Sequence, residues 1–275
     1  DQPFSVSSGL GILAIAHAAS QSGIKVLLTG DGADECFGGY SWYEHLATLK
    51  NKNNLYDDSQ ISFQSVGYSV NDRLELISKM NPQQRAWAWH YYAHENEKID
   101  LFSNDWSEDL LNSNYHFSSL NKDSTNLDYI KHDRDFYFPN EMLTKVDRML
   151  MAYSVEGRTP FAARSVQQLA NHLSIKQMVS KDNLKWVLRK AFEDILPMDV
   201  INRPKHGFNI PIDYWLNNEW SDMVEEAFVE GSMLHNYGII NRDSYSVALR
   251  LLSDENRLNG HTIFSMIMLN KWLGQ

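Results

Sequence analysis

The chain has 275 residues, of which 43% are hydrophobic and 22% charged, an ordinary composition for a globular protein. A net charge of −10 argues against a nucleic-acid footprint, which needs a basic stripe. One cysteine excludes an internal disulfide, and no apolar run is long enough to span a bilayer. With no signal segment, we expect a cytoplasmic protein. Because the chain begins Asp1-Gln2-Pro3, we expect a processed or trimmed piece.

The first elements form a helix, a strand and a glycine-rich loop. Residues 7–22 have the pattern of a helix, with Ser7 or Ser8 as its cap and Gly23 as its stop. "IKVLLTG" follows as a buried strand, and a further helix begins near Ser41. A strand, a glycine-rich loop and a helix in this order bind phosphates in open α/β sheets.

The remaining chain is mostly helical by its apolar spacing. The predicted helices cover residues 71–80, 82–97, 140–155, 165–174, 182–196, 219–229 and 261–273, and polar loops cover residues 51–69 and 103–123. One strand cannot form a sheet alone, so we expect its parallel partners to precede Asp1.

Acidic side chains crowd the glycine-rich loop. Asp31, Asp34 and Glu35 stand among Gly30, Gly32, Gly38 and Gly39. Mg²⁺ is held by one or two carboxylates together with substrate phosphates, so the loop is a candidate for magnesium bound to a nucleotide. The alternative is an acidic cluster that caps a helix in a solvated turn. The spacing does not fit a calcium EF-hand.

The segment 140–161 combines a buried stripe with charged residues. Its apolar stripe consists of Met142, Leu143, Val146, Met149, Leu150 and Tyr153. Glu141, Lys145 and Arg148 share another face, where an exposed ladder of ion pairs is the commoner outcome. Asp147 flanks the stripe and could be a paired, half-buried acid, and Arg158 could cap the end of the helix.

A basic segment follows further along the chain. Lys185 and Arg189 are predicted on one side of a helix whose other side is buried through Leu184, Val187, Leu188, Ala191, Phe192 and Ile195. "RPKHGF" then forms a rigid turn in which Lys205 suits a phosphate or a developing oxyanion. An ordinary basic surface loop is the alternative.

Two other signals are weak. His90 and His94 are four residues apart, as in zinc sites, but no Glu follows the first histidine. Cys36 has no evident His–Asp pairing, so we expect it to be buried.

Three ordered motifs together carry a family resemblance. "LLTGDGADECFGGY", "LTKVDRMLMAYSVEGRTPF" and "LKWVLRKAFEDILP" with "INRPKHGFNIPI" resemble the synthetase domain of glutamine-dependent asparagine synthetases, as does "DQPFSVSS". The likeness is weakest over residues 44–131. It implies an α/β, predominantly helical fragment of an adenine-nucleotide α-hydrolase-like (ATP-pyrophosphatase) domain, whose first strands precede this chain.

The resemblance also implies a reaction and its residues. ATP would adenylate the side-chain carboxylate of aspartate, and ammonia derived from glutamine would attack the β-aspartyl-AMP. Asp31 and Lys205 would be catalytic, Thr29, Gly30, Lys185 and Arg189 would bind ATP, and Asp34 would hold Mg²⁺. Glu141, Lys145, Asp147 and Arg148 are candidates near the substrate. Neither nucleic acid nor membrane is an expected partner, and a homodimer is among the assemblies it allows.

The chain departs from the family at several points. The family's pyrophosphate loop and its amino-terminal glutaminase domain are absent, so we expect residues 1–275 to be a synthetase domain that is inactive alone. Gly157 and Thr159 replace commoner apolar residues, and Ala162-Ala163 follow Phe161. Another carboxylate, such as a sugar acid, therefore stays open as the substrate. A non-catalytic helical binding fragment is the alternative of another class.

Overall fold

The computed structural model describes residues 3–44, 82, 85–86, 100–103, 120–121, 123–179, 183–203, 210–254 and 260–275. Two compact units divide the chain: residues 8–52 with 120–209, and residues 1–7 with 53–119 and 210–275. The helices predicted over 71–80 and 82–97 lie almost entirely outside the described residues. No helix in the described ranges is long and apolar enough to cross a membrane.

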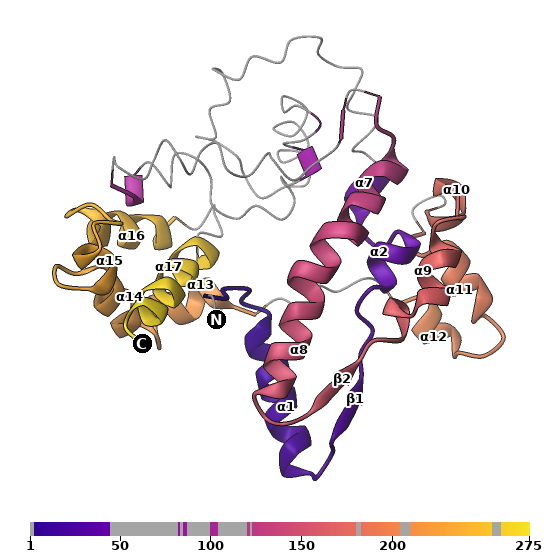
Figure 1. Cartoon of the computed structure of the whole chain (residues 1–275), viewed down its shortest axis with the longest axis horizontal. Coiled ribbons are helices and arrows are strands. Elements are labelled where there is room, and N and C mark those ends of the chain that lie inside the picture. Colours follow the sequence, from indigo (N-terminus) through magenta and orange to yellow (C-terminus); the bar gives the residue numbers. More distant parts are fainter. Residues whose placement is uncertain are drawn as a thin grey trace. The chain divides into compact units, whose positions relative to one another are not determined.

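The first unit contains a two-stranded parallel sheet. Strand β1 (Val26–Leu28) pairs with β2 (Glu156–Arg158), with Val26 opposite Glu156 and Leu28 opposite Arg158 (Figure 1). The expectation that the partners of β1 would all precede Asp1 therefore missed β2. The expectation of a buried strand was also wrong, because the Leu28 side chain is 76% exposed. Among the described strands, β1 has a partner on only one edge, and helices cover one face.

Helices α1 (Gly9–Gln21) and α8 (Thr144–Met151) lie side by side against this sheet (Figure 1). The predicted helix over 7–22 is confirmed. The core between them consists of Ala16, Ala19, Val146, Leu150 and Val155, with Ile12 and Leu27 packed against it. The small alanines let α1 approach α8 closely. Gly157 does the same for β2, because a Cβ there would lie 2.7 Å from a methyl carbon of Leu150.

The helix predicted over 140–155 is longer toward its amino end than the sequence indicated. It begins as α7 (Asn126–His132), where Thr125 and Asp128 form a capping box, and continues through η4 (Asp133–Leu143) into α8. η4 is a π-helix that contains Pro139. Proline has no backbone N–H and prevents ordinary α-helical bonding, and the Asn140 side chain instead donates to the Phe136 carbonyl at 2.8 Å.

Short helices complete the first unit. They are α2 (Ala33–Phe37), η1 (Ser41–Glu44), η5 (Pro160–Ala162), α9 (Arg164–Ala170), α10 (Ile175–Met178), α11 (Trp186–Ala191) and α12 (Met198–Ile201). The helix predicted over 182–196 is therefore shorter than expected. Phe192 and Ile195, predicted to be buried, are 41% and 71% exposed.

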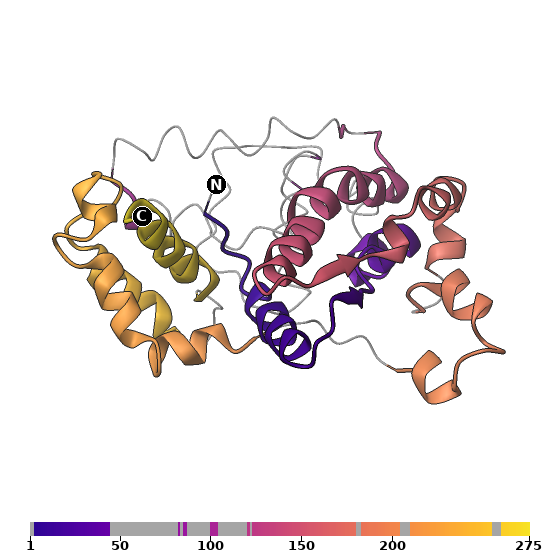
Figure 2. The same ribbon diagram turned by 60° about the horizontal axis from the view of Figure 1, so that its bottom comes forward.

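The second unit is helical in its described part. It contains α13 (Ile212–Asn217), α14 (Ser221–Phe228), α15 (Met233–Asn236), α16 (Ser244–Leu252) and α17 (Gly260–Leu273). Helix α17 packs against α13, α14 and α15 (Figure 2), burying Ile263, Phe264 and Ile267. The predicted helices over 219–229 and 261–273 are confirmed. A bridge between Phe102 and Ile240 ties the segment 100–103 to this bundle.

Candidate active site

The glycine-rich loop leads directly from β1 into α2. Gly32 precedes α2 with a φ of +91°, a left-handed conformation that favours glycine. Gly39 has a different reason: a Cβ at this position would lie 1.7 Å from Oδ1 of Asp34. The Asp34 carboxylate therefore lies directly against the Gly39 backbone. The glycines of this loop shape the space that the carboxylate occupies.

Lys185 reaches the same carboxylate from a distant part of the chain. Its Nζ lies 2.9 Å from Oδ1 of Asp34, and each side chain is 25% exposed. Lys185 is the N-cap of α11 and adopts φ +54° and ψ +39°, a left-handed conformation that is costly for a residue with a Cβ. Its backbone N–H donates to the Gly38 carbonyl at 3.2 Å. The backbone of Lys185 is thus held where its ammonium meets Asp34.

Arg189 lies one turn further along α11 and contacts the next helix. Its guanidinium donates to the carbonyl of Ile201, and to that of Arg203 at 3.4 Å. These carbonyls stand at the end of α12, where backbone acceptors lack helical partners. Arg189 therefore fixes α12 against α11. The prediction that Arg189 binds ATP stays untested.

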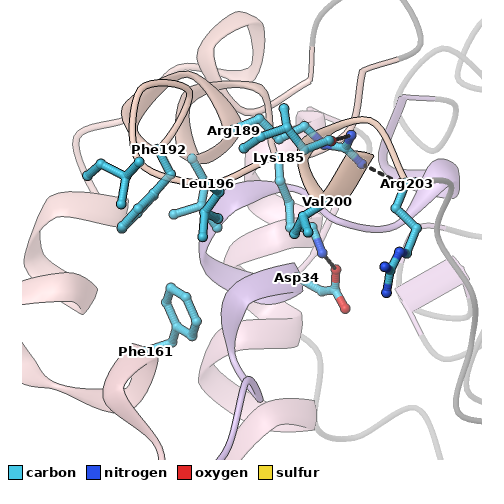
Figure 3. A pocket seen from close by; sticks show the side chains of 11 residues that line it. Asp34, Phe161, Lys185, Arg189, Phe192, Leu196, Val200 and Arg203 are labelled. Atoms are coloured by element: carbon cyan, nitrogen blue, oxygen red, sulfur yellow. Dashed lines mark hydrogen bonds and ion pairs between the residues drawn. The ribbon is translucent and has the colours of Figure 1, made fainter. Parts of the chain in front are cut away.

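A cavity of about 550 Å³ opens beside the Asp34–Lys185 pair. Its lining residues are Asp34, Phe161, Lys185, Leu188, Arg189, Phe192, Ile195, Leu196, Val200, Ile201 and Arg203. Figure 3 shows Phe161, Phe192 and Leu196 on one side, with the dashed contact between Lys185 and Asp34 on the other. Leu188, Phe192 and Ile195, which were predicted to form the buried side of the helix over 182–196, thus face a cavity rather than a core.

Lys145 is buried rather than part of an exposed ladder of ion pairs. The residue is only 5% exposed, and its Nζ lies 3.3 Å from Oγ of Ser8 and from Sδ of Met142. Burial lowers the pKa of Lys145, and the charges of Asp31, Glu141 and Glu35 act in the opposite direction. Asp31 and Glu141 are therefore electrostatic neighbours of a buried ammonium group. The helical spacing indicated the relation of Lys145 to Glu141, but not its relation to Asp31.

The other candidates on this helix lie differently. Asp147 is exposed, so the expectation of a half-buried acid was wrong, and Arg148 is half-buried. Arg158 does not cap a helix: it belongs to β2 and its Nε lies 2.9 Å from Oε1 of Glu156, with both side chains exposed.

The end of the sheet carries Thr29 and Gly30. The hydroxyls of Thr29 and Thr159 are hydrogen-bonded at 3.0 Å, and the Thr29 N–H donates to the Arg158 carbonyl at 2.8 Å. Gly30 follows with its backbone exposed. Thr159, which the sequence marked only as a departure from the family, therefore positions the hydroxyl that was predicted to contact AMP.

Glu35 belongs to a buried network. It is 1% exposed and accepts a hydrogen bond from the Tyr40 hydroxyl at 2.7 Å. Burial raises the pKa of Glu35, which the Tyr40 hydrogen bond opposes. Cys36 is buried as predicted, and burial raises the pKa of its thiol to about 11. Neither side chain is placed as a metal ligand or a nucleophile.

The predicted metal ligand Asp34 has its carboxylate paired with Lys185. No group of three or more His, Cys, Asp or Glu suited to a metal occurs in the described part of the chain. Asp34 alone still fits a magnesium ion that is held mainly by phosphate oxygens. Lys205, His90 and His94 lie outside the described residues.

Comparison with known proteins identifies the family. The asparagine synthase family model matches residues 1–274. Asparagine synthetase (glutamine-hydrolyzing) 1 of Bacillus subtilis is 28% identical over 99% of this chain and 44% of its own length. An asparagine synthetase-type protein of Mycobacterium tuberculosis is 28% identical over 83% of this chain and 36% of its own length.

A protein named Amidase chry2, of Gibberella zeae, is 23% identical over 81% of this chain and 38% of its own length. The chain thus spans less than half the length of these relatives. The match over nearly every residue, together with the convergence of two of its motifs at Asp34 and Lys185, shows that the chain belongs to the asparagine synthase family.

Proposed function

We propose that this chain supplies the synthetase domain of an ATP-dependent amide-forming ligase. The proposed reaction converts aspartate to asparagine through a β-aspartyl adenylate, with ammonia released from glutamine elsewhere in the protein. The observation that carries the proposal is the ion pair of Asp34 with Lys185, which joins the glycine-rich loop to the basic segment across 151 residues of sequence. Family membership supports the reaction class.

The first chemical step is attack at phosphorus. A carboxylate oxygen of the acid attacks the α-phosphorus of ATP, and the bond to the bridging oxygen breaks as pyrophosphate leaves. Ammonia then attacks the activated carbonyl carbon, AMP leaves with the electron pair of the broken C–O bond, and a proton is lost from nitrogen. Such chemistry is catalysed mainly by positioning and charge neutralisation.

The candidate residues have separate tasks in this proposal. Thr29 and Gly30 bind AMP, with the Thr29 hydroxyl oriented by Thr159. Lys185 already stands beside a carboxylate and offers its ammonium to the leaving phosphates. Asp31 assists formation and aminolysis of the adenylate, and Lys205 neutralises the α-phosphate. Magnesium at Asp34 would neutralise the charge that develops on pyrophosphate.

A second candidate is amidation of a different carboxylate. It is supported by the apolar side of the cavity, and two relatives carry the name amidase. A cytoplasmic location and a homodimer stay predictions.

The test is ATP–pyrophosphate exchange by the intact protein. We expect Asp34→Asn to lower exchange by about 10²–10³-fold, the usual cost of losing one group that stabilises developing charge. Asp222→Asn on α14 is the matched control and should leave exchange unchanged. Full exchange by the intact protein with Asp34→Asn would reject the proposal. It would favour the alternative in which residues 1–275 are a non-catalytic binding fragment of that protein.

A further inference from the structure

The cavity beside Asp34 has two chemically different sides. Phe192, Ile195, Leu196 and Val200 form part of the apolar side and are 41%, 71%, 41% and 43% exposed. Side chains of this size and chemistry are more stable when covered. Because they gather around one cavity, they form a coherent surface for the apolar part of a ligand. The cavity volume of about 550 Å³ is in the range of small-molecule sites.

The other side favours an anion. Lys185, Arg189 and Arg203 line the cavity together with a single carboxylate, Asp34, which gives these groups a net formal charge of +2. Lys185 is neutralised by Asp34, and Arg189 is engaged with backbone carbonyls. Within the described ranges the Arg203 guanidinium has no carboxylate partner. A single negative group beside Arg203 would lower this net charge from +2 to +1 and give the guanidinium a charged partner.

The nucleotide is not the best occupant of this cavity. The residues proposed to bind AMP, Thr29 and Gly30, are not among the lining residues, so the cavity meets the nucleotide site only near Asp34 and Lys185. Free aspartate also fits poorly. Its two carboxylates can pair with the cations of the cavity, but the apolar wall would leave its ammonium without hydrogen-bond partners.

We propose that the acid activated by this protein carries an aliphatic or aryl body, which lies against Phe192, Leu196 and Val200 while its carboxylate points toward Asp34 and Lys185. This inference rests on the second candidate function, amidation of a carboxylate other than aspartate, and names the class of that acid. Asp34 and Lys185 then stand where the carboxylate meets the α-phosphate of ATP. Arg203 attracts the anion to this end of the cavity.

The experiment measures binding and exchange separately in the intact protein. 4-Phenylbutyrate and hexanoate serve as probes, with aspartate for comparison; binding is followed by calorimetry without ATP, and activity by ATP–pyrophosphate exchange. Leu196→Glu places a carboxylate in the apolar wall. Leu249→Glu on α16 is the matched control, because Leu249 is 46% exposed and belongs to the other unit.

We expect the apolar acids to bind and to support exchange, with a Kd raised at least tenfold by Leu196→Glu and also by Arg203→Ala, and unchanged by the control. Binding of the apolar acids that depends on Leu196 and Arg203, without exchange by any of the three acids, would support the ligand class while rejecting the proposed reaction. Failure of both apolar acids to bind, or binding that neither variant weakens, would overturn the inference. Exchange with aspartate in that case would leave the proposed reaction intact.

Discussion

The left-handed backbone of Lys185 leads to an unusual prediction about stability. At an ordinary helical position alanine is more stable than glycine by about 1 kcal/mol. At Lys185, with φ +54°, a residue that has a Cβ pays about 1–2 kcal/mol for the left-handed conformation. Glycine avoids that cost but loses about 0.4–1 kcal/mol through the greater freedom of its unfolded chain. We therefore expect Lys185→Gly to be more stable than Lys185→Ala by roughly 0.5–1 kcal/mol.

The comparison isolates the backbone because both variants lose the same ion pair with Asp34. Lys190, an exposed residue of the same helix that pairs with Glu193, provides the control. There Lys190→Ala should be the more stable of the two variants. The measurement is the urea midpoint of the intact protein for all four variants, at equal slope of the transition. Alanine more stable than glycine at both positions would refute the left-handed conformation of Lys185.

Three further outcomes follow from the packing of the loop. Gly39→Ala should remove most ATP–pyrophosphate exchange, because the Cβ added at residue 39 would lie 1.7 Å from Oδ1 of Asp34 and would displace that carboxylate. Unchanged exchange would contradict the position of Asp34 against the Gly39 backbone. The wild type should lose stability as pH rises from 4.5 through the raised pKa of Glu35, because the folded state holds the proton of Glu35 more tightly than the unfolded state does. Glu35→Gln should remove this loss, so melting temperatures of the two proteins measured from pH 4 to 8 should diverge in favour of the variant. A constant difference between the two melting temperatures would count against the prediction. Cys36, with a thiol pKa of about 11, should react with a disulfide reagent at pH 8 only as fast as the protein unfolds, and rapid labelling of the native protein would show that the thiol is accessible.

The sequence predicted those parts of the site that depend on local pattern. The glycine-rich loop after β1 and the basic residues Lys185 and Arg189 were recognised from residue types and spacing. Their meeting at one cavity was expected only through the family resemblance, and the ion pair of Lys185 with Asp34 is the contact that joins them. Helix α17 was predicted because apolar residues recur at helical spacing over residues 261–273.

Features that depend on tertiary contacts could not be predicted in this way. Strand β2 has only three residues, Glu156–Arg158, and two of them are charged, so nothing in their pattern indicates a strand. The π-helix η4 has a wider turn than the 3.6-residue period assumed in reading the helix, so side chains around Pro139 are displaced from their expected faces. Lys145 is buried where it meets Ser8 and Gly9 at the start of α1, which no helical spacing reveals.

The uncovered face of β1 affects how residues 1–275 will behave when handled by themselves. Val26 and Leu28 lie on one side of β1 and are 38% and 76% exposed, and Ile24, which precedes the strand, is 43% exposed. Parallel sheets normally have both faces covered, and an open edge beside apolar side chains recruits strands from other molecules. A concentrated sample of this segment should therefore self-associate through β1, and adding a charge at Leu28 should keep it monodisperse.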